Sequence, residues 1–169
     1  MPKQASSQSA KREQKTDALA LLAADHKEVK DLFKSYDKLV TSEAGDDEKE
    51  ALATQICSML TVHATIEEEI FYPAARDNID EQDLLDEAEV EHASAKDLIA
   101  QIEGMTPDEE LFDAKVKVLG EYVAHHVKEE EDELFPKVKR AKLDLQALGD
   151  ELAARKEELM AEADTEQAT

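Results

Sequence analysis

The sequence predicts an all-α protein, an antiparallel up-and-down four-helix bundle followed by a short fifth helix. Two observations carry this prediction. First, the chain of 169 residues contains only 4 Gly and 4 Pro, while 41% of its residues are hydrophobic and 37% are charged. A chain with few helix breakers and much Ala, Leu, Glu and Lys favours helices. Second, apolar residues recur at alternating steps of three and four, as in the helices of a left-handed bundle.

Composition divides the chain into three parts. Residues 1–15 are polar and rich in Ser and Gln, so they cannot bury apolar surface and are expected to form a disordered tail. Residues 16–142 carry the periodic pattern and are expected to form the bundle. Residues 143–169 are expected to hold a C-terminal helix that ends in a frayed tail.

Capping and breaking residues place the first two helices. The first is expected to run from Thr16, a suitable N-cap, to about Val40, where the sequence TSEAGDD interrupts the pattern. The second is expected to start at Asp46 or Asp47, both good caps, and to end near Arg76. The short loops make neighbouring helices antiparallel.

The remaining helices follow the same logic. The third is expected after Asp80 and ends near Gly104. The fourth is expected to begin at the sequence TPDE (residues 106–109), with Thr106 as N-cap, the proline at the first helical position and the glutamate completing a capping box, and to reach about residue 141. A shorter amphipathic stretch over residues 143–161 predicts the fifth helix.

Each of the four main helices carries one apolar stripe, and each stripe is interrupted near its middle by a histidine. In the second and fourth helices a glutamate follows four residues later, on the same face. The six interrupting residues are His26, His63, Glu67, His92, His126 and Glu130.

Two sequence motifs each occur twice along the chain. HATIEEEIFYP (63–73) matches HVKEEEDELFP (126–136), and HKEVKDLF (26–33) matches HASAKDLI (92–99). The simplest interpretation is a doubled helical hairpin with pseudo-twofold symmetry, whose two halves share one central site. Pro73 and Pro136 hold equivalent places, where each should kink or end its helix.

A bare cluster of four imidazoles and two carboxylates inside a bundle would be strongly destabilising, because each buried polar group without a partner costs several kcal/mol. Two divalent metal ions would offset that cost. The mixture of nitrogen and oxygen ligands suits iron, manganese or zinc, and argues against calcium and magnesium. Because consecutive helical residues point about 100° apart, only Glu67 and Glu130 of the acidic runs face inward. His125 and Cys57 are expected to lie outside the ligand set.

A ferritin-like site is the competing metal architecture. It uses Glu-x-x-His on two helices. Only EVEH (89–92) fits that spacing here, whereas the other pairs place the histidine first.

The motifs resemble the hemerythrin-like, or HHE cation-binding, domain over about residues 17 to 140. The resemblance rests on His26, HATIEEEIFYP, His92 and HHVKEEEDELFP (125–136). It implies a four-helix bundle around a non-haem di-iron centre, with the six inward residues as iron ligands and the two glutamates as bridges. One turn after His92, where oxygen-carrying hemerythrins have another histidine, this chain has Lys96. The resemblance therefore implies something other than simple reversible oxygen carriage.

The leading hypothesis is a di-iron protein that binds or reacts with dioxygen, hydrogen peroxide or nitric oxide. The alternatives are a module that stores iron or senses iron or oxygen without turnover, and a purely structural bundle; zinc or manganese is a less favoured metal. The formal net charge of −22 argues against nucleic acid and anionic membranes as partners. One cysteine, no long apolar run and no signal-peptide pattern predict a cytoplasmic protein.

Overall fold

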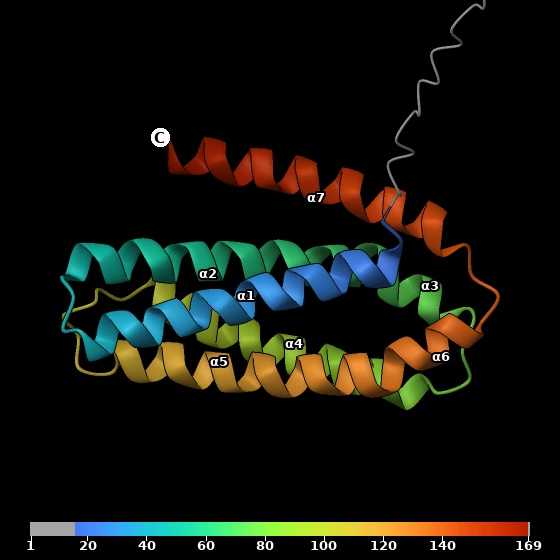
Figure 1. Cartoon of the computed structure of the whole chain (residues 1–169), viewed down its shortest axis with the longest axis horizontal. Coiled ribbons are helices and arrows are strands. Elements are labelled where there is room, and N and C mark those ends of the chain that lie inside the picture. Colours follow the sequence, from blue (N-terminus) through green and yellow to red (C-terminus); the bar gives the residue numbers. More distant parts are fainter. Residues whose placement is uncertain (1–15, 169) are drawn as a thin grey trace, which may run out of the picture.

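The computed structural model describes residues 16–168 and confirms the all-α bundle (Figure 1). The predicted tail, residues 1–15, lies outside the described residues. The helical elements, of which η1 and η2 are π-helical, are α1 (Ala18–Thr41), α2 (Asp46–Ile66), η1 (Glu67–Phe71), α3 (Tyr72–Arg76), α4 (Gln82–Glu103), α5 (Phe112–Glu129), η2 (Glu130–Leu134), α6 (Phe135–Arg140) and α7 (Leu145–Gln167).

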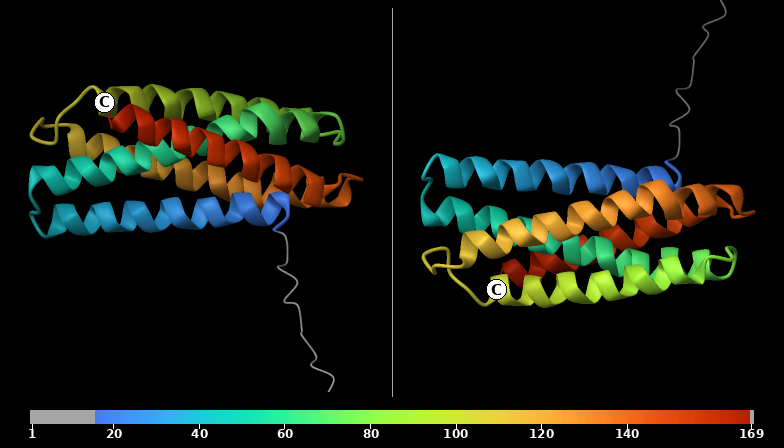
Figure 2. Two further views of the ribbon diagram at one scale, coloured as in Figure 1. Left: turned by 90° about the horizontal axis from the view of Figure 1, so that it is seen from above. Right: turned by 90° about the horizontal axis from the view of Figure 1, so that it is seen from below.

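Four helical columns form the bundle. Helix α1 packs against α2 and α5, and α4 packs against the same two helices, so the four make a closed ring. α7 lies outside this ring, on α1 and α2, as the views from above and below also show (Figures 1 and 2). The site at the middle of the bundle is therefore covered by α7 on one side only.

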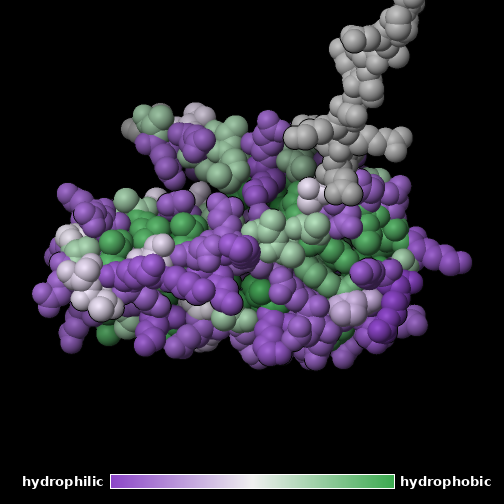
Figure 3. All heavy atoms as spheres, in the orientation of Figure 1, coloured by the Kyte–Doolittle hydropathy of each residue, from purple (hydrophilic) through white to green (hydrophobic). Residues whose placement is uncertain are grey.

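The core consists of two apolar clusters separated by a polar layer. Along α1, Leu22 belongs to one cluster and Val29 to the other, and His26 lies between them. The same order holds in the second column, where His63 separates Leu60 from Ile66. Each of the four histidines thus stands at the same depth in the bundle. Hydrophilic side chains cover most of the face seen in Figure 3, and hydrophobic residues show mainly between the helices.

Two predicted helix starts were wrong. α1 is capped by Asp17 rather than Thr16, and its side chain accepts a hydrogen bond from the Ala20 backbone N–H at 2.9 Å. The fourth helix was expected at Thr106 but begins at Phe112. The Glu109 carboxylate does accept from the Thr106 N–H at 2.6 Å, as in a capping box. However, the Thr106 hydroxyl bonds to the neighbouring Asp108 side chain, and turns follow. Local side-chain bonds of this kind compete with helix initiation.

The two prolines neither end their helices at once nor leave them regular. In each half a π-helical segment precedes the proline: the Tyr72 N–H bonds to the Glu67 carbonyl, and the Phe135 N–H bonds to the Glu130 carbonyl. These hydrogen bonds join residues five apart instead of four. The wider turn reduces the clash that a proline ring makes with the preceding turn of an α-helix. Helix α3 then continues to Arg76 and α6 to residue 140.

α7 is longer than the fifth helix that the sequence predicted over residues 143–161. Asp144 caps it, accepting from the Ala147 N–H at 3.0 Å, and it continues to Gln167. A β-carbon added at Gly149 would lie 2.8 Å from the carbonyl oxygen of Thr16 and from the backbone nitrogen of Ala18. The glycine therefore allows α7 to approach the start of α1 closely. No helix in the described part of the chain is long and apolar enough to cross a membrane.

Candidate metal centre

All six predicted site residues meet in the polar layer. Glu67 Oε1 lies 2.9 Å from His63 Nε2 and 3.6 Å from His92 Nε2. Glu130 Oε2 lies 2.9 Å from His126 Nε2, and its Oε1 lies 3.8 Å from His26 Nε2. Both glutamates therefore touch histidines from both halves of the chain.

The cluster divides into two groups of potential ligands. The ligand atoms of His26, His63 and Glu67 lie within 4.8 Å of one another, and so do those of Glu67, His92 and His126. Glu67 belongs to both groups. This arrangement provides two adjacent positions with a shared carboxylate, as the doubled sequence motif predicted.

Five buried side-chain atoms of this cluster have no hydrogen-bond partner among residues 16–168. They are His26 Nε2, His63 Nε2, both carboxylate oxygens of Glu67 and Glu130 Oε1. His63 Nε2 and Glu67 Oε1 are close, but their geometry is not that of a hydrogen bond. Buried polar atoms in native proteins are nearly always satisfied. The unpaired atoms are all of the kinds that bind iron, manganese or zinc, so the residues present fit a metal pair.

Each of the four histidines has a carboxylate at its other ring nitrogen. Asp25 accepts from His63 Nδ1 at 2.9 Å, and Glu91 accepts from His126 Nδ1 at 3.0 Å. Within each half, the partner is the residue that directly precedes the other histidine.

The other two partnerships join the halves. Glu68 accepts from His92 Nδ1 at 3.1 Å, and Glu131 accepts from His26 Nδ1 at the same distance. With Nδ1 protonated, Nε2 keeps its lone pair and faces the centre. Partners of this kind fix the tautomer and orientation of metal-binding histidines. The sequence analysis placed Glu68 and Glu131 outside the ligand set without finding this function.

Two of the four carboxylates that bond to the histidines are themselves paired with lysines. The Lys96 ammonium lies 2.6 Å from both oxygens of Glu68. Lys156, on α7, binds the other oxygen of Asp25. α7 therefore reaches the centre through one intermediate carboxylate.

Tyr72 is the site residue that the sequence analysis missed. Its buried hydroxyl donates to Glu130 Oε2 at 2.9 Å and lies 3.2 Å from His92 Nε2 and 3.3 Å from His126 Nε2. The π-helical segment explains the omission. In a regular α-helix, the residues that share the inward face with Glu67 would be 70 and 71. The π-helical segment adds one residue to this turn, so that Phe71 and Tyr72 are the buried residues instead.

The two halves differ at this position. The equivalent of Tyr72 is Phe135, which stacks on His26 with ring centroids 5.9 Å apart. A phenol thus lies beside the His92 and His126 pair, and a hydrocarbon ring beside the other. Neither glutamate near His92 takes the place where Lys96 stands: Glu91 accepts a hydrogen bond from His126 Nδ1, and Glu89 is exposed beside Arg76.

Burial and charge act on the first histidine pair in opposite ways. Burial lowers the pKa of His63, but the carboxylates of Glu67 and Asp25 outweigh it and raise that pKa to about 10. The pKa of His26 is lowered, mainly by burial and despite the nearby Glu130 carboxylate.

The second pair repeats this split. Burial opposes protonation of His126, yet Glu130 raises the pKa of His126 to about 9. Burial and the neighbouring His126 lower the pKa of His92 to about 4. One imidazole in each pair thus holds a proton beside the buried carboxylates at neutral pH. Metal binding would displace these protons.

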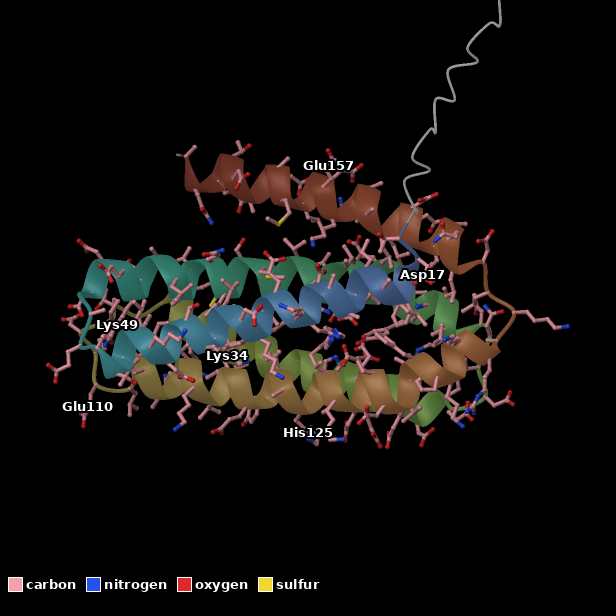
Figure 4. The ribbon with its side chains drawn as sticks, in the orientation of Figure 1. Asp17, Lys34, Lys49, Glu110, His125 and Glu157 are labelled. Carbon is pink, nitrogen blue, oxygen red and sulfur yellow. The ribbon has the colours of Figure 1, made fainter. Side chains whose placement is uncertain are left out.

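The two residues that were expected to lie outside the ligand set, His125 and Cys57, lie away from the centre. His125 projects from the outer side of α5 and pairs with Glu129 at 3.1 Å (Figure 4). Together with Glu91 these two form a third, more exposed group of potential ligand atoms. Cys57 is buried in an apolar cluster, and burial raises the pKa of its thiol to about 12.

Comparison with known proteins supports this reading of the site. The family model described as the hemerythrin HHE cation binding domain matches residues 17–138. The chain belongs to this family.

A solved hemerythrin-family structure has the same fold. It is an HHE cation binding domain-containing protein from Mycobacterium kansasii, a homolog of Rv2633c, with a TM-score of 0.75 and 25% sequence identity over 90% of this chain and 93% of that one. A curated relative, a DNA nickase from Nostoc sp. (strain PCC 7120 / SAG 25.82 / UTEX 2576), is 32% identical over 123 residues. The match covers 70% of this chain, which spans only about a third (32%) of the length of that relative. The findings support a metal-binding hemerythrin-like protein.

Proposed function

We propose that this hemerythrin-family chain holds two iron ions between its four histidines and reacts there with a small oxidant, namely dioxygen, hydrogen peroxide or nitric oxide. Two observations carry the proposal: the five unpaired buried atoms, and the two groups of potential ligand residues that share Glu67. When bound, iron would supply Lewis-acid and redox chemistry at exchangeable positions.

The chain's own residues have distinct functions in this proposal. His26 and His63 would hold one ion, His92 and His126 the other, and Glu67 and Glu130 would bridge them. The Nδ1 carboxylates keep all four imidazoles oriented. Such preorganisation reduces the rearrangement that binding requires.

Tyr72 supplies a proton close to the reacting positions. Burial, followed by the charges of Glu67 and Glu130, raises the pKa of its phenol well above the ordinary value. The phenol therefore stays protonated at neutral pH and donates to Glu130. A proton held at this oxygen is available when an oxidant is reduced nearby.

Access to the centre favours reaction over storage. A cavity of about 220 Å³ reaches all four histidines, and the exposed side chains of Val90 and Tyr122 also line it. A small oxidant could enter without any movement of the helices.

The test is stopped-flow absorption of the anaerobic, iron(II)-loaded chain mixed with hydrogen peroxide or with dioxygen. We expect oxidation much faster than that of free iron(II), and consumption of peroxide beyond one equivalent per centre with release of dioxygen. A single stoichiometric oxidation without further consumption would favour the storage or sensing alternative. Oxidation no faster than that of iron(II) in buffer would contradict the proposal.

A further inference from the structure

The cavity beside the metal centre is larger than the proposed oxidants need. Its volume is about 220 Å³. A water molecule takes about 30 Å³ of the liquid, and an apolar cavity of about 150 Å³ inside a protein can hold benzene. The metal ions would take part of this space, and the remainder suits a molecule of about six or seven non-hydrogen atoms.

The wall of the cavity is mainly apolar beyond its inner end, although the polar side chains of Thr61, Ser94 and Lys96 also border it. The inner end carries the four site histidines and Glu67. Beyond them, the wall is formed by hydrophobic side chains from all four columns of the bundle. Its main members are Val29, Met59, Leu60, Ala95, Ile99 and Val123. Apolar pockets with a few convergent polar groups are typical of small-molecule sites.

The mouth of the cavity exposes hydrophobic surface. Val90 on α4 and Tyr122 on α5 are 67% and 50% exposed, although both are large hydrophobic side chains. Both also line the cavity, so exposed apolar surface is continuous with the cavity wall. The Lys96 ammonium also borders the cavity, but it is paired with Glu68.

Charge selects against one class of occupant. The net charge of the chain is −22. An organic anion would therefore be repelled on approach, whereas a neutral molecule would not.

We infer that this cavity binds a neutral, apolar organic molecule of about benzene to toluene size and presents it to the metal centre. As a statement about the substrate class of that centre, the inference rests on the proposed function; as a statement about binding, it does not. It adds an organic co-substrate pocket to a site otherwise sized for a diatomic or peroxide ligand.

The experiment measures toluene binding to the full chain loaded with zinc, by equilibrium dialysis and by NMR of methionine methyl groups. Met59 lines the cavity and reports occupancy. We expect one saturable toluene site per chain and a shift of the Met59 methyl signal.

Two variants fill the cavity from neighbouring columns, Ala95→Leu on α4 and Ala64→Leu on α2. Each should weaken toluene binding at least tenfold. Ala93→Leu, at an exposed position of α4 that does not line the cavity, is the matched control and should bind as the native chain does.

Absence of saturable toluene binding in the zinc-loaded native chain would overturn the inference, as would equal binding by the native chain and both filled variants. Metal content and the iron oxidation rate are measured on the same samples. A chain that holds metal but excludes toluene refutes only the pocket, whereas a chain that binds toluene without holding metal refutes only the proposed function.

Discussion

Glu68 accepts a hydrogen bond from His92 across the two halves of the chain, at 3.1 Å. Glu131 makes the reciprocal contact to His26 at the same distance. Each half thus orients one histidine of the other half. The acidic runs that follow His63 and His126 therefore serve two purposes. Their first glutamate faces the centre, and their second fixes an imidazole from behind.

Because the first glutamate of each run faces the centre and the second bonds to a histidine, we expect their substitutions to have different effects on metal binding. Glu67→Ala and Glu130→Ala should each lose at least one of the two metal ions, because each removes a carboxylate shared by both positions. Glu68→Ala and Glu131→Ala should keep both ions and bind them about 10–100-fold more weakly. Elemental analysis followed by chelator competition measures both effects. Equal loss of ions in all four variants would show that the inner and outer assignments are wrong.

Lys96 should act through Glu68 rather than at the metal. Lys96→Met removes the ammonium that contacts both Glu68 oxygens and leaves this carboxylate freer to move. We expect a severalfold loss of metal affinity with unchanged stoichiometry, measured by chelator competition. Lys27→Met is the control, since Lys27 pairs only with Asp31 on the surface of α1. A Lys96 variant indistinguishable from that control would rule out the positioning function.

The metal-free chain should lose stability as pH rises above neutrality. The folded-state pKa values of His63 and His126, about 10 and about 9, lie above the ordinary value of 6.5. Their contribution to stability is therefore fully present below pH 6.5 and is lost as pH rises toward these values. Between pH 6.5 and 8.5 the free energy of unfolding should fall, by at most about 1.4 kcal/mol per pH unit for each proton retained.

Urea unfolding at several pH values measures this slope. Zinc-loaded protein is the control, and it should lack the decrease, because bound metal replaces the two protons. A metal-free chain whose stability is flat or rises over this range would contradict the protonated pair.

Gly149 should be needed for the docking of α7. A β-carbon there would meet backbone atoms of residues 16–18 at 2.8 Å, so Gly149→Ala must push the helix away from α1. We expect a loss of about 1–3 kcal/mol in unfolding free energy, the usual cost of overpacking. Gly45→Ala is the control, because nothing lies within 4 Å of its added β-carbon. Stability equal in both variants would show that the contact between α7 and α1 is not tight.

The sequence predicted the fold and the inner residues because both follow from helical periodicity. Four stripes with a histidine at matching depth define four columns and one polar layer, and the structure brings His26, His63, Glu67, His92, His126 and Glu130 together. That these residues bind metal stays a prediction until metal loading is measured. The division of the chain into a tail, a bundle and a C-terminal helix also stays a prediction.

What the sequence did not predict depends on departures from α-helical spacing or on contacts between distant segments. Tyr72 faces inward only because a π turn precedes Pro73. Lys156 reaches Asp25 only because α7 folds back onto α1. The late start of α5 depends on a local competition at Thr106, where the side chain of Asp108 takes the hydroxyl. None of these follows from the periodicity of a single helix.

Iron content measured together with thermal unfolding tests the central claim most directly. The full chain is produced in an iron-replete host, and its metal is quantified by elemental analysis before and after reconstitution with iron(II). We predict two iron ions per chain and a higher unfolding temperature for the loaded form, because ions that bind only the folded state stabilise it. Iron content near zero, with an unfolding temperature unchanged by iron loading, would contradict this prediction.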